Sequence, residues 1–187
     1  MPPKIRIEKE AILRAALDLV REQGEPSLNA RNLAMALGCS TQPIFSNFAT
    51  MEELRRAVIE EAYALYRRRI DGEMARGEFP PYKASGMAYI AFAEEERELF
   101  RLLFMRDRRG EPMGGTSDEM REMSALLRKK VGLNEEEASL FHVEMWMYVH
   151  GIATVIATGY QNFDREMISR MLSDAYMGLK KRYEEKE

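Results

Sequence analysis

The sequence is poor in the residues that build metal sites, disulfides and nucleophilic centres. It holds one cysteine and two histidines in 187 residues, too few for a zinc site, and one cysteine cannot form a disulfide within the chain. Neither a glycine-rich phosphate loop nor a serine nucleophile motif is present. We therefore expect no enzyme activity, no cofactor and no metal, and the cysteine content fits a reducing compartment.

The sequence also lacks a hydrophobic run long enough to predict a membrane span. From Met145 to Tyr160 no formally charged side chain occurs. This segment is shorter than the ~20 residues that cross a bilayer, and it carries His150, two glycines and two threonines. We interpret it as a buried or interface helix. The first ten residues are charged and predict no signal peptide, so we expect a cytoplasmic protein without a membrane partner.

Charge of one sign does not dominate the chain. The net charge is −3, from 28 basic and 31 acidic residues, and residues 1–60 carry eight of each. A protein that only coats nucleic acid is normally basic. Any sequence-specific DNA binding would therefore depend on geometry and dimerisation more than on the electrostatic field.

The apolar pattern predicts an all-α fold. Apolar residues recur at i, i+3, i+4 and i+7 nearly throughout, whereas the alternation typical of strands is absent. Two capping boxes, Thr50 with Glu53 and Asn134 with Glu137, mark helix starts, and residues 106–116 form the loop richest in helix breakers. We predict helices over residues 8–23, about 30–37, 41–47, 50–76, 81–94, 96–106, 117–131, 134–159 and 164–184.

The first three helices have the pattern of a helix-turn-helix. Gly38-Cys39-Ser40 provides a tight turn between the second and third helices, and Ala34 is small enough for their close crossing. Ile44 and Phe48 are predicted to pack the third helix onto the first two. Its outer face then presents short or planar side chains, namely Ser40, Thr41, Gln42, Phe45 and Asn47.

Residues 10–58 resemble the DNA-binding domain of the TetR family of regulators. The shared features, in order, are Ala15-Ala16, Gly24, Leu33-Ala34, Gly38-Cys39-Ser40, Phe45, Phe48 and Glu53-Leu54. A shorter pattern, formed by Trp146, His150 and Gly151, resembles the C-terminal domain of a Trp-His-Gly subgroup. The resemblance implies a three-helix DNA-binding domain over residues 1–50 and a helical-bundle regulatory and dimerisation domain over residues 51–187.

The resemblance also implies DNA-binding residues. Thr41, Gln42 and Pro43 would face base edges in the major groove. The positions expected at phosphates are Asn29, Arg31, Ser40, Phe45 and Asn47, and Lys4, Arg6 and Lys9 would add contacts from an N-terminal arm. Two positions depart from the family pattern: Phe45 often is a tyrosine and Met51 often is a lysine, which puts two phosphate contacts in doubt.

The remainder of the chain suggests a ligand site and a dimer interface. Apolar pockets with few polar groups bind small molecules, and the candidate lining residues are Tyr89, Phe92, Phe104, Met123, Phe141, His142, Met145 and Trp146, with His150 as a further polar group. For any one of them, ordinary core packing is the stronger interpretation. The last two helices are expected to pair with those of a second copy, as in the family, through small residues such as Gly151 and through a stripe from Met167 to Gly178.

Together these features predict a homodimeric transcriptional repressor. It would bind a palindromic double-stranded DNA operator and be released by a small apolar or amphipathic effector. The alternative is a helical ligand-binding protein of the same fold that no longer binds DNA specifically, which the neutral N-terminal segment and Met51 would suit.

Overall fold

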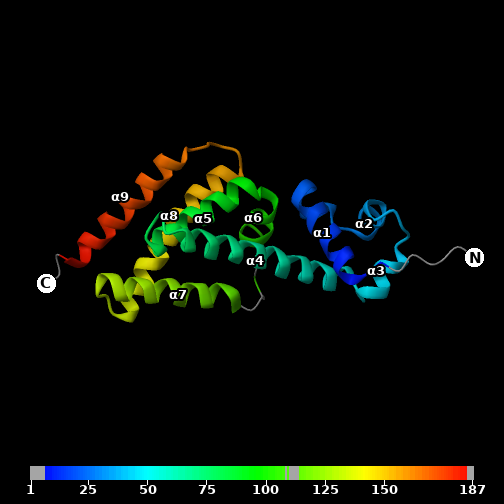
Figure 1. The fold of residues 1–187 in the computed structure, drawn as a ribbon, viewed down its shortest axis with the longest axis horizontal. Coiled ribbons are helices and arrows are strands. Elements are labelled where there is room, and N and C mark those ends of the chain that lie inside the picture. Colours follow the sequence, from blue (N-terminus) through cyan, green and yellow to red (C-terminus); the bar gives the residue numbers. More distant parts are fainter. Residues whose placement is uncertain (1–6, 108, 110–113, 185–187) are drawn as a thin grey trace, which may run out of the picture. The chain divides into compact units, whose positions relative to one another are not determined.

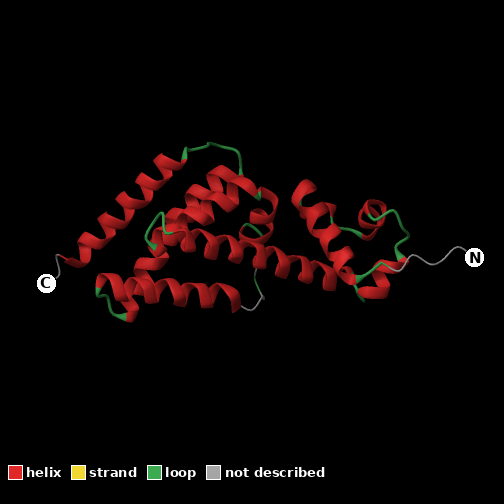
Figure 2. Cartoon of the chain, viewed as in Figure 1, coloured by secondary structure: helices red, strands yellow, loops and turns green. Residues whose placement is uncertain are grey.

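The computed structural model (Figure 1) describes residues 7–107, 109 and 114–184, and for residues 114–117 the backbone only. Within these ranges every regular element is a helix (Figure 2), which confirms the all-α prediction. The elements are α1 (Lys9–Gln23), η1 (Glu25–Ser27), α2 (Ala30–Ala36), α3 (Gln42–Asn47), α4 (Met51–Arg76), α5 (Pro81–Glu95), α6 (Arg97–Phe104), α7 (Gly114–Val131), α8 (Glu135–Ala157) and α9 (Arg165–Glu184).

The chain divides into two compact units. The N-terminal unit comprises residues 1–67 and 96–106, and the C-terminal unit comprises residues 68–95 and 107–187. The continuous helix α4 contributes to both, and α6 belongs to the N-terminal unit although it follows α5 in sequence. The boundary expected between residues 50 and 51 thus falls inside a compact unit, and as the limit of the DNA-binding domain it stays a prediction.

The N-terminal unit is built around α1. This helix packs against α2, α3 and α6, and its buried face includes Ile12 and Val20, both fully buried. From α6 the fully buried Leu99 and Phe100 join this unit. An exposed ion pair links α1 to the start of α6, because Arg21 Nε donates to Glu96 Oε2 at 2.8 Å.

The C-terminal unit is built around the contact of α5 with α8, against which α7 and α9 also pack. Gly86 allows the close approach of three helices: a Cβ atom there would lie 3.3 Å from Leu172 Cδ1 of α9 and 3.5 Å from Val149 Cγ2 of α8. A hydrophobic core cluster also lies in this unit, and its buried members are Leu127, Leu133, Ala138, Phe141, Met145 and Tyr183.

The expected capping boxes fix two helix starts. At α8, Glu137 N–H donates to Asn134 Oδ1 at 3.0 Å, and Asn134 N–H donates to Glu137 Oε2 at 3.2 Å. At α4, Glu53 N–H donates to Thr50 Oγ1 at 3.1 Å, whereas the Glu53 carboxylate accepts from Ala49 N–H at 2.7 Å. The reciprocal bond therefore reaches one residue further back than a regular capping box would have it.

Helix α8 is long and apolar enough to cross a membrane by length and composition alone. Its most apolar 18-residue window has a mean hydropathy of 1.2, and 44% of that window is buried inside the protein. Three glutamates occupy its first turn, and its buried face packs on α5 and α7. These contacts support the sequence-based interpretation of this segment as a buried or interface helix, and the exposed Leu140, Val143, Met147 and Tyr148 show that one face is left open by this chain.

Candidate functional site

The turn between α2 and α3 is fixed by its backbone. Gly38 has a φ of 62°, in the left-handed region that glycine adopts at little cost. Gly38 N–H donates to Met35 O at 3.1 Å and Cys39 N–H donates to Ala34 O at 2.9 Å, which is the paired hydrogen bonding of a Schellman motif. The turn predicted from Gly38-Cys39-Ser40 is therefore present, and it sets the direction in which α3 leaves α2.

Helix α3 is anchored by one face and open on the other. Ile44 is fully buried and Phe48, directly after the helix, is nearly so, as predicted. Thr41 and Gln42 are exposed at the start of the helix, and Pro43 lies in its first turn, where its missing N–H is not needed. The three residues expected at base edges thus stand together on the exposed first turn.

The residues expected at phosphates differ in whether their side chains are exposed or already hydrogen-bonded within the protein. Ser40 and Arg31 are exposed, and the Phe45 ring is 47% exposed. The Asn47 amide instead donates to Pro43 O at 2.8 Å and to Ile7 O at 3.2 Å. The donor group of Asn47 therefore holds the chain before α1 against the end of α3, and a phosphate role would have to compete with these bonds.

Asn29 has a structural role at the start of α2. Its Oδ1 accepts from Asn32 N–H at 3.0 Å, and its amide donates to Ser27 O at 3.2 Å. Asn29 is therefore the N-cap of α2. Met35, on the same helix, was not among the candidates although its side chain is 74% exposed. In the sequence, Met35 directly follows the two residues of α2 that face the core, Leu33 and Ala34, and this position indicates that its side chain is exposed.

Basic side chains around the N-terminal unit are partly neutralised. Arg55 forms ion pairs with Glu25 and Glu52, which ties it to neighbouring acidic side chains of the same unit. The Lys9 ammonium lies 4.7 Å from the centre of the Phe48 ring and 4.0 Å from Glu53. Lys4 and Arg6 of the expected N-terminal arm lie outside the described residues.

Seven of the eight predicted pocket residues lie in the C-terminal unit. Phe104 is the exception: it belongs to the N-terminal unit, where its ring lies 5.1 Å from Tyr66 and 5.2 Å from Phe100. Phe141 packs on Tyr176 at 5.3 Å within the core cluster. The others are buried, except Trp146, which is half-buried. The seven are Tyr89, Phe92, Met123, Phe141, His142, Met145 and Trp146.

Two tyrosine–histidine pairs cross from α5 to α8. Tyr82 OH and His142 Nδ1 are 3.0 Å apart, and Tyr89 OH and His150 Nδ1 are 2.8 Å apart. Burial lowers the pKa of His142 from 6.5 to about 4 and also lowers the pKa of His150, so both rings are held neutral. Burial likewise raises the pKa of Tyr82 and of Tyr89.

The Trp146 ring lies close to the second of these pairs. It stacks on His150, with ring centres 5.0 Å apart and planes 14° apart. The sequence had suggested His142 and His150 as polar groups of the pocket, but it gave no signal that tyrosines of α5 would be their partners. The arrangement places two neutral polar pairs within an otherwise apolar helix contact.

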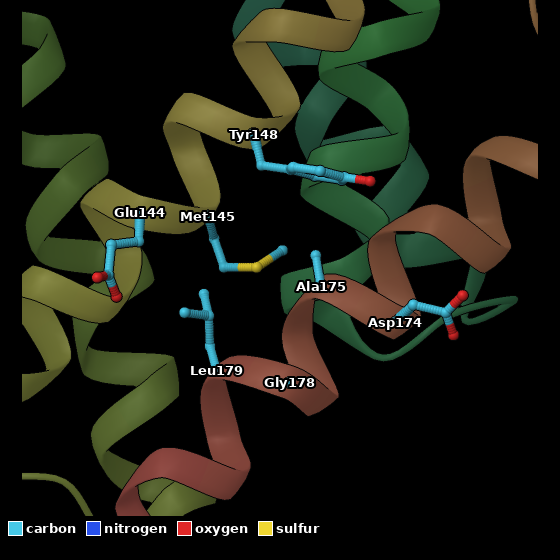
Figure 3. Close-up of a pocket in the computed structure, with 7 residues that line it drawn as sticks. All are labelled: Glu144, Met145, Tyr148, Asp174, Ala175, Gly178 and Leu179. Atoms are coloured by element: carbon cyan, nitrogen blue, oxygen red, sulfur yellow. The ribbon is translucent and has the colours of Figure 1, made fainter.

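An open groove of about 390 Å³ lies between α8 and α9 (Figure 3). Met145 and Leu179 point toward each other across its floor, and the carboxylates of Glu144 and Asp174 lie at its two sides. Of the predicted pocket residues, Met145 alone lines this groove. Among the described residues no group of three or more histidine, cysteine or carboxylate side chains is placed to hold a metal ion.

Comparison with known proteins identifies the family. A family model described as Tetracyclin repressor-like, C-terminal domain matches residues 82–175, just over half of the chain. The chain belongs to the TetR family of transcriptional regulators. As a TetR family member it is a regulator with a helix-turn-helix DNA-binding segment, and not an enzyme. Its subgroup, including the Trp-His-Gly subgroup, stays a prediction.

Two solved structures share the fold of this TetR family member over nearly its whole length. A TetR-like transcriptional regulator from Rhodococcus sp. RHA1 is 14% identical, with a TM-score of 0.70 over 96% of this chain and 98% of that one. A chain from Pseudomonas aeruginosa PAO1 assigned as a transcriptional regulator is 15% identical, with a TM-score of 0.71 over 94% and 93%. No curated protein is significantly similar in sequence.

Proposed function

We propose that this TetR family member is a cytoplasmic homodimeric repressor that binds a palindromic operator and is released by a small apolar or amphipathic ligand. The observation that carries the proposal is the two-sided character of α3. Its inner side is anchored by Ile44 and Phe48, and its outer first turn leaves Thr41 and Gln42 exposed. A short helix held in this way can enter a major groove without unfolding.

The first turn of α3 supplies base contacts in this proposal. Gln42 can form a bidentate pair with adenine and Thr41 can contact a base edge or a thymine methyl group. Ser40 and Arg31 are exposed and would bind phosphates, and the exposed Phe45 would pack against the DNA backbone. Asn29 would contribute mainly by capping α2, and Asn47 by holding α3.

The open face of α8 supports dimerisation through the last two helices. Its exposed apolar side chains share one face, and Gly151 on that face has no heavy atom within 4 Å of an added Cβ. A second copy related by two-fold symmetry would bury this face and present two α3 helices to half-sites ~34–36 Å apart. The exposed residues concerned are Leu140, Val143, Met147 and Tyr148 of α8, with Met167 and Met177 of α9.

The interior of the C-terminal unit is the proposed ligand site. Seven buried or half-buried aromatic, methionine and histidine side chains share this unit, and the Tyr82–His142 and Tyr89–His150 pairs offer hydrogen-bonding groups. An apolar or amphipathic molecule matches this mixture. A ligand that prefers one arrangement of α4, the helix shared by both units, by a few kcal/mol would suffice to change operator affinity.

Fluorescence anisotropy with a library-selected palindromic duplex tests the DNA-binding part. We expect Gln42→Ala to weaken binding by about 1–3 kcal/mol, because a bidentate base contact is lost. Gln23→Ala is the matched control, since Gln23 is an exposed glutamine at the end of α1. Measured at two salt concentrations, wild-type affinity should fall with salt as neutralised phosphates require.

The same assay then tests ligand release. Compounds that raise the unfolding temperature of the protein should lower its operator affinity. If Gln42→Ala binds as tightly as Gln23→Ala, α3 does not read bases in this way. If a folded dimer selects no duplex at all, the alternative applies: a ligand-binding protein of the same fold that no longer binds DNA specifically.

A further inference from the structure

The first residue of α9 joins this helix to the end of α4. The Arg165 guanidinium donates from one nitrogen to Glu73 Oε1 at 2.7 Å and to Glu78 Oε2 at 2.8 Å. Glu73 lies in the last turns of α4, and Glu78 lies in the segment between α4 and α5. All three residues belong to the C-terminal unit, so the contact lies within one compact body.

Burial makes this more than a surface ion pair. The Glu73 side chain is only 10% exposed, although Arg165 is 48% exposed. A carboxylate removed from water is costly unless it is paired, and Glu73 has two cationic partners, since Arg76 donates to its other oxygen at 3.0 Å. Arg165 is the partner that comes from a distant part of the sequence.

Aromatic and polar contacts reinforce the same junction. The Phe79 ring has the Arg165 guanidinium 5.4 Å from its centre and the Lys83 ammonium 4.8 Å from its centre. Lys83 also donates to Ser173 Oγ, two turns further along α9, at 2.8 Å. The N-terminal half of α9 is therefore held to the end of α4 and the start of α5 by contacts that fix its direction as well as its position.

We infer that Arg165 is a positioning residue for operator spacing, because it holds the dimerisation helix α9 to the end of the helix that carries the DNA-binding unit. The inference rests on the proposed function as a dimeric operator-binding protein. Helix α4 runs without interruption from Met51 to Arg76 and contributes to both compact units, so in this inference a displacement of its far end is passed along the helix. A dimer built on α8 and α9 then sets the separation of its two α3 helices through this junction.

The chain provides its own probe for this separation. Cys39 is its one cysteine and lies in the turn before α3, half-buried. Spin labels on Cys39 of both subunits report the distance between the two DNA-binding segments without DNA and without an added cysteine. Arg165→Met keeps a long apolar stem over Phe79 and removes the charge, and Arg170→Met, an exposed arginine on the same helix, is the matched control.

We expect a narrow distance distribution for wild type and Arg170→Met, and a broadened or shifted one for Arg165→Met in a dimer that stays folded by circular dichroism. On duplexes whose half-sites are moved apart by one or two base pairs, Arg165→Met should lose at least about fivefold of the wild-type preference for one spacing. A role of Arg165 in the stability of α9 alone would change neither the distances nor the spacing preference.

Each result decides one point. Unchanged distances and unchanged spacing preference in Arg165→Met overturn the inference while the proposed function stands. A wild-type dimer with a narrow distribution that binds no duplex overturns the proposed DNA binding, and the labels on Cys39 still test the role of Arg165. A wild type that is monomeric overturns the dimer and the inference with it.

Discussion

At the scale of single residues, His142 links the pH to the stability of the C-terminal unit. Burial lowers its pKa from 6.5 to about 4, so between these values the unfolded chain takes up a proton that the folded protein does not. Its contribution to stability is complete above pH 6.5 and is lost as the pH falls toward 4. The loss is on the order of 3 kcal/mol, because one pKa unit corresponds to 1.36 kcal/mol.

Unfolding in denaturant between pH 7.5 and 4.5 measures this effect. His142→Gln keeps an acceptor for the Tyr82 hydroxyl and cannot titrate, so its stability should fall less steeply with acidification than that of wild type. His150→Gln serves as comparison: burial lowers the pKa of His150 too, but the ring is only half-buried, so the stability of this variant should follow the wild-type pH profile more closely than that of His142→Gln does. If the free energy of unfolding of wild type and of His142→Gln changes with pH in the same way, His142 has the same pKa in the folded and the unfolded protein, and the prediction is wrong.

The hydrogen-bond partner of His142 could not be predicted from the sequence. Ile44 and Phe48 could be assigned to the core from helical spacing alone, because their partners lie on neighbouring helices of a short segment. Tyr82 and His142 are 60 positions apart, and no local pattern pairs them. Which tyrosine meets which histidine depends on the register between α5 and α8, which only the packed structure determines.

At the scale of elements, helix ends were more predictable than helix partners. Asn134 and Glu53 act through bonds to residues a few positions away, so their capping roles can be read from sequence. Helix α7 begins at Gly114, three residues before its expected start, since adjacent glycines suggested a loop. Phe104 was predicted to line the pocket, yet α6 packs in the N-terminal unit. The contacts of α6 with α1, which is distant in sequence, determine this placement.

Two glycine substitutions should have opposite effects on their helices. Gly38 ends α2 with a φ of 62° and an added Cβ would meet nothing within 4 Å. Gly38→Ala should therefore destabilise by about 1–2 kcal/mol through backbone strain alone. Gly72 lies inside α4, again with nothing within 4 Å, so Gly72→Ala should stabilise by about 0.5–1 kcal/mol.

Thermal unfolding followed by circular dichroism compares the two variants directly. Both add one methyl group in open space, so any difference between them comes from the backbone conformation. Gly38→Ala should also weaken operator binding, because the turn directs α3. Equal stability of Gly38→Ala and wild type would mean that the turn adopts another conformation in solution.

At the scale of the whole molecule, the uncharged segment of α8 has one face buried within the chain and one apolar face exposed. Ile152 and Ala153 are buried against the same chain, whereas Met147 and Gly151 are exposed. The sequence predicted a helix without a solvent side, but one chain covers only half of it. The other half is understandable if a second copy covers it, and the sequence of one chain cannot show which half that is.

Met147 is the place to test this arrangement. Its side chain is 59% exposed in the middle of the apolar face of α8. Met147→Glu would place a carboxylate in the proposed dimer contact, close to Glu144 on the same helix, where burial of an unpaired charge costs several kcal/mol. We expect a monomer by light scattering at concentrations where wild type is a dimer, and at least a 100-fold loss of affinity for the full palindrome, corresponding to about 2.7 kcal/mol.

Met35→Glu is the matched control, because Met35 is even more exposed but belongs to α2 of the N-terminal unit and is not part of the proposed dimer face. It should remain a dimer, whatever its effect on DNA. A half-site duplex separates dimerisation from folding: Met147→Glu should bind it as weakly as wild type does, since the DNA-binding unit is unchanged. If Met147→Glu is still a dimer, the open face of α8 is not the dimer contact, and the groove beside α9 needs another occupant.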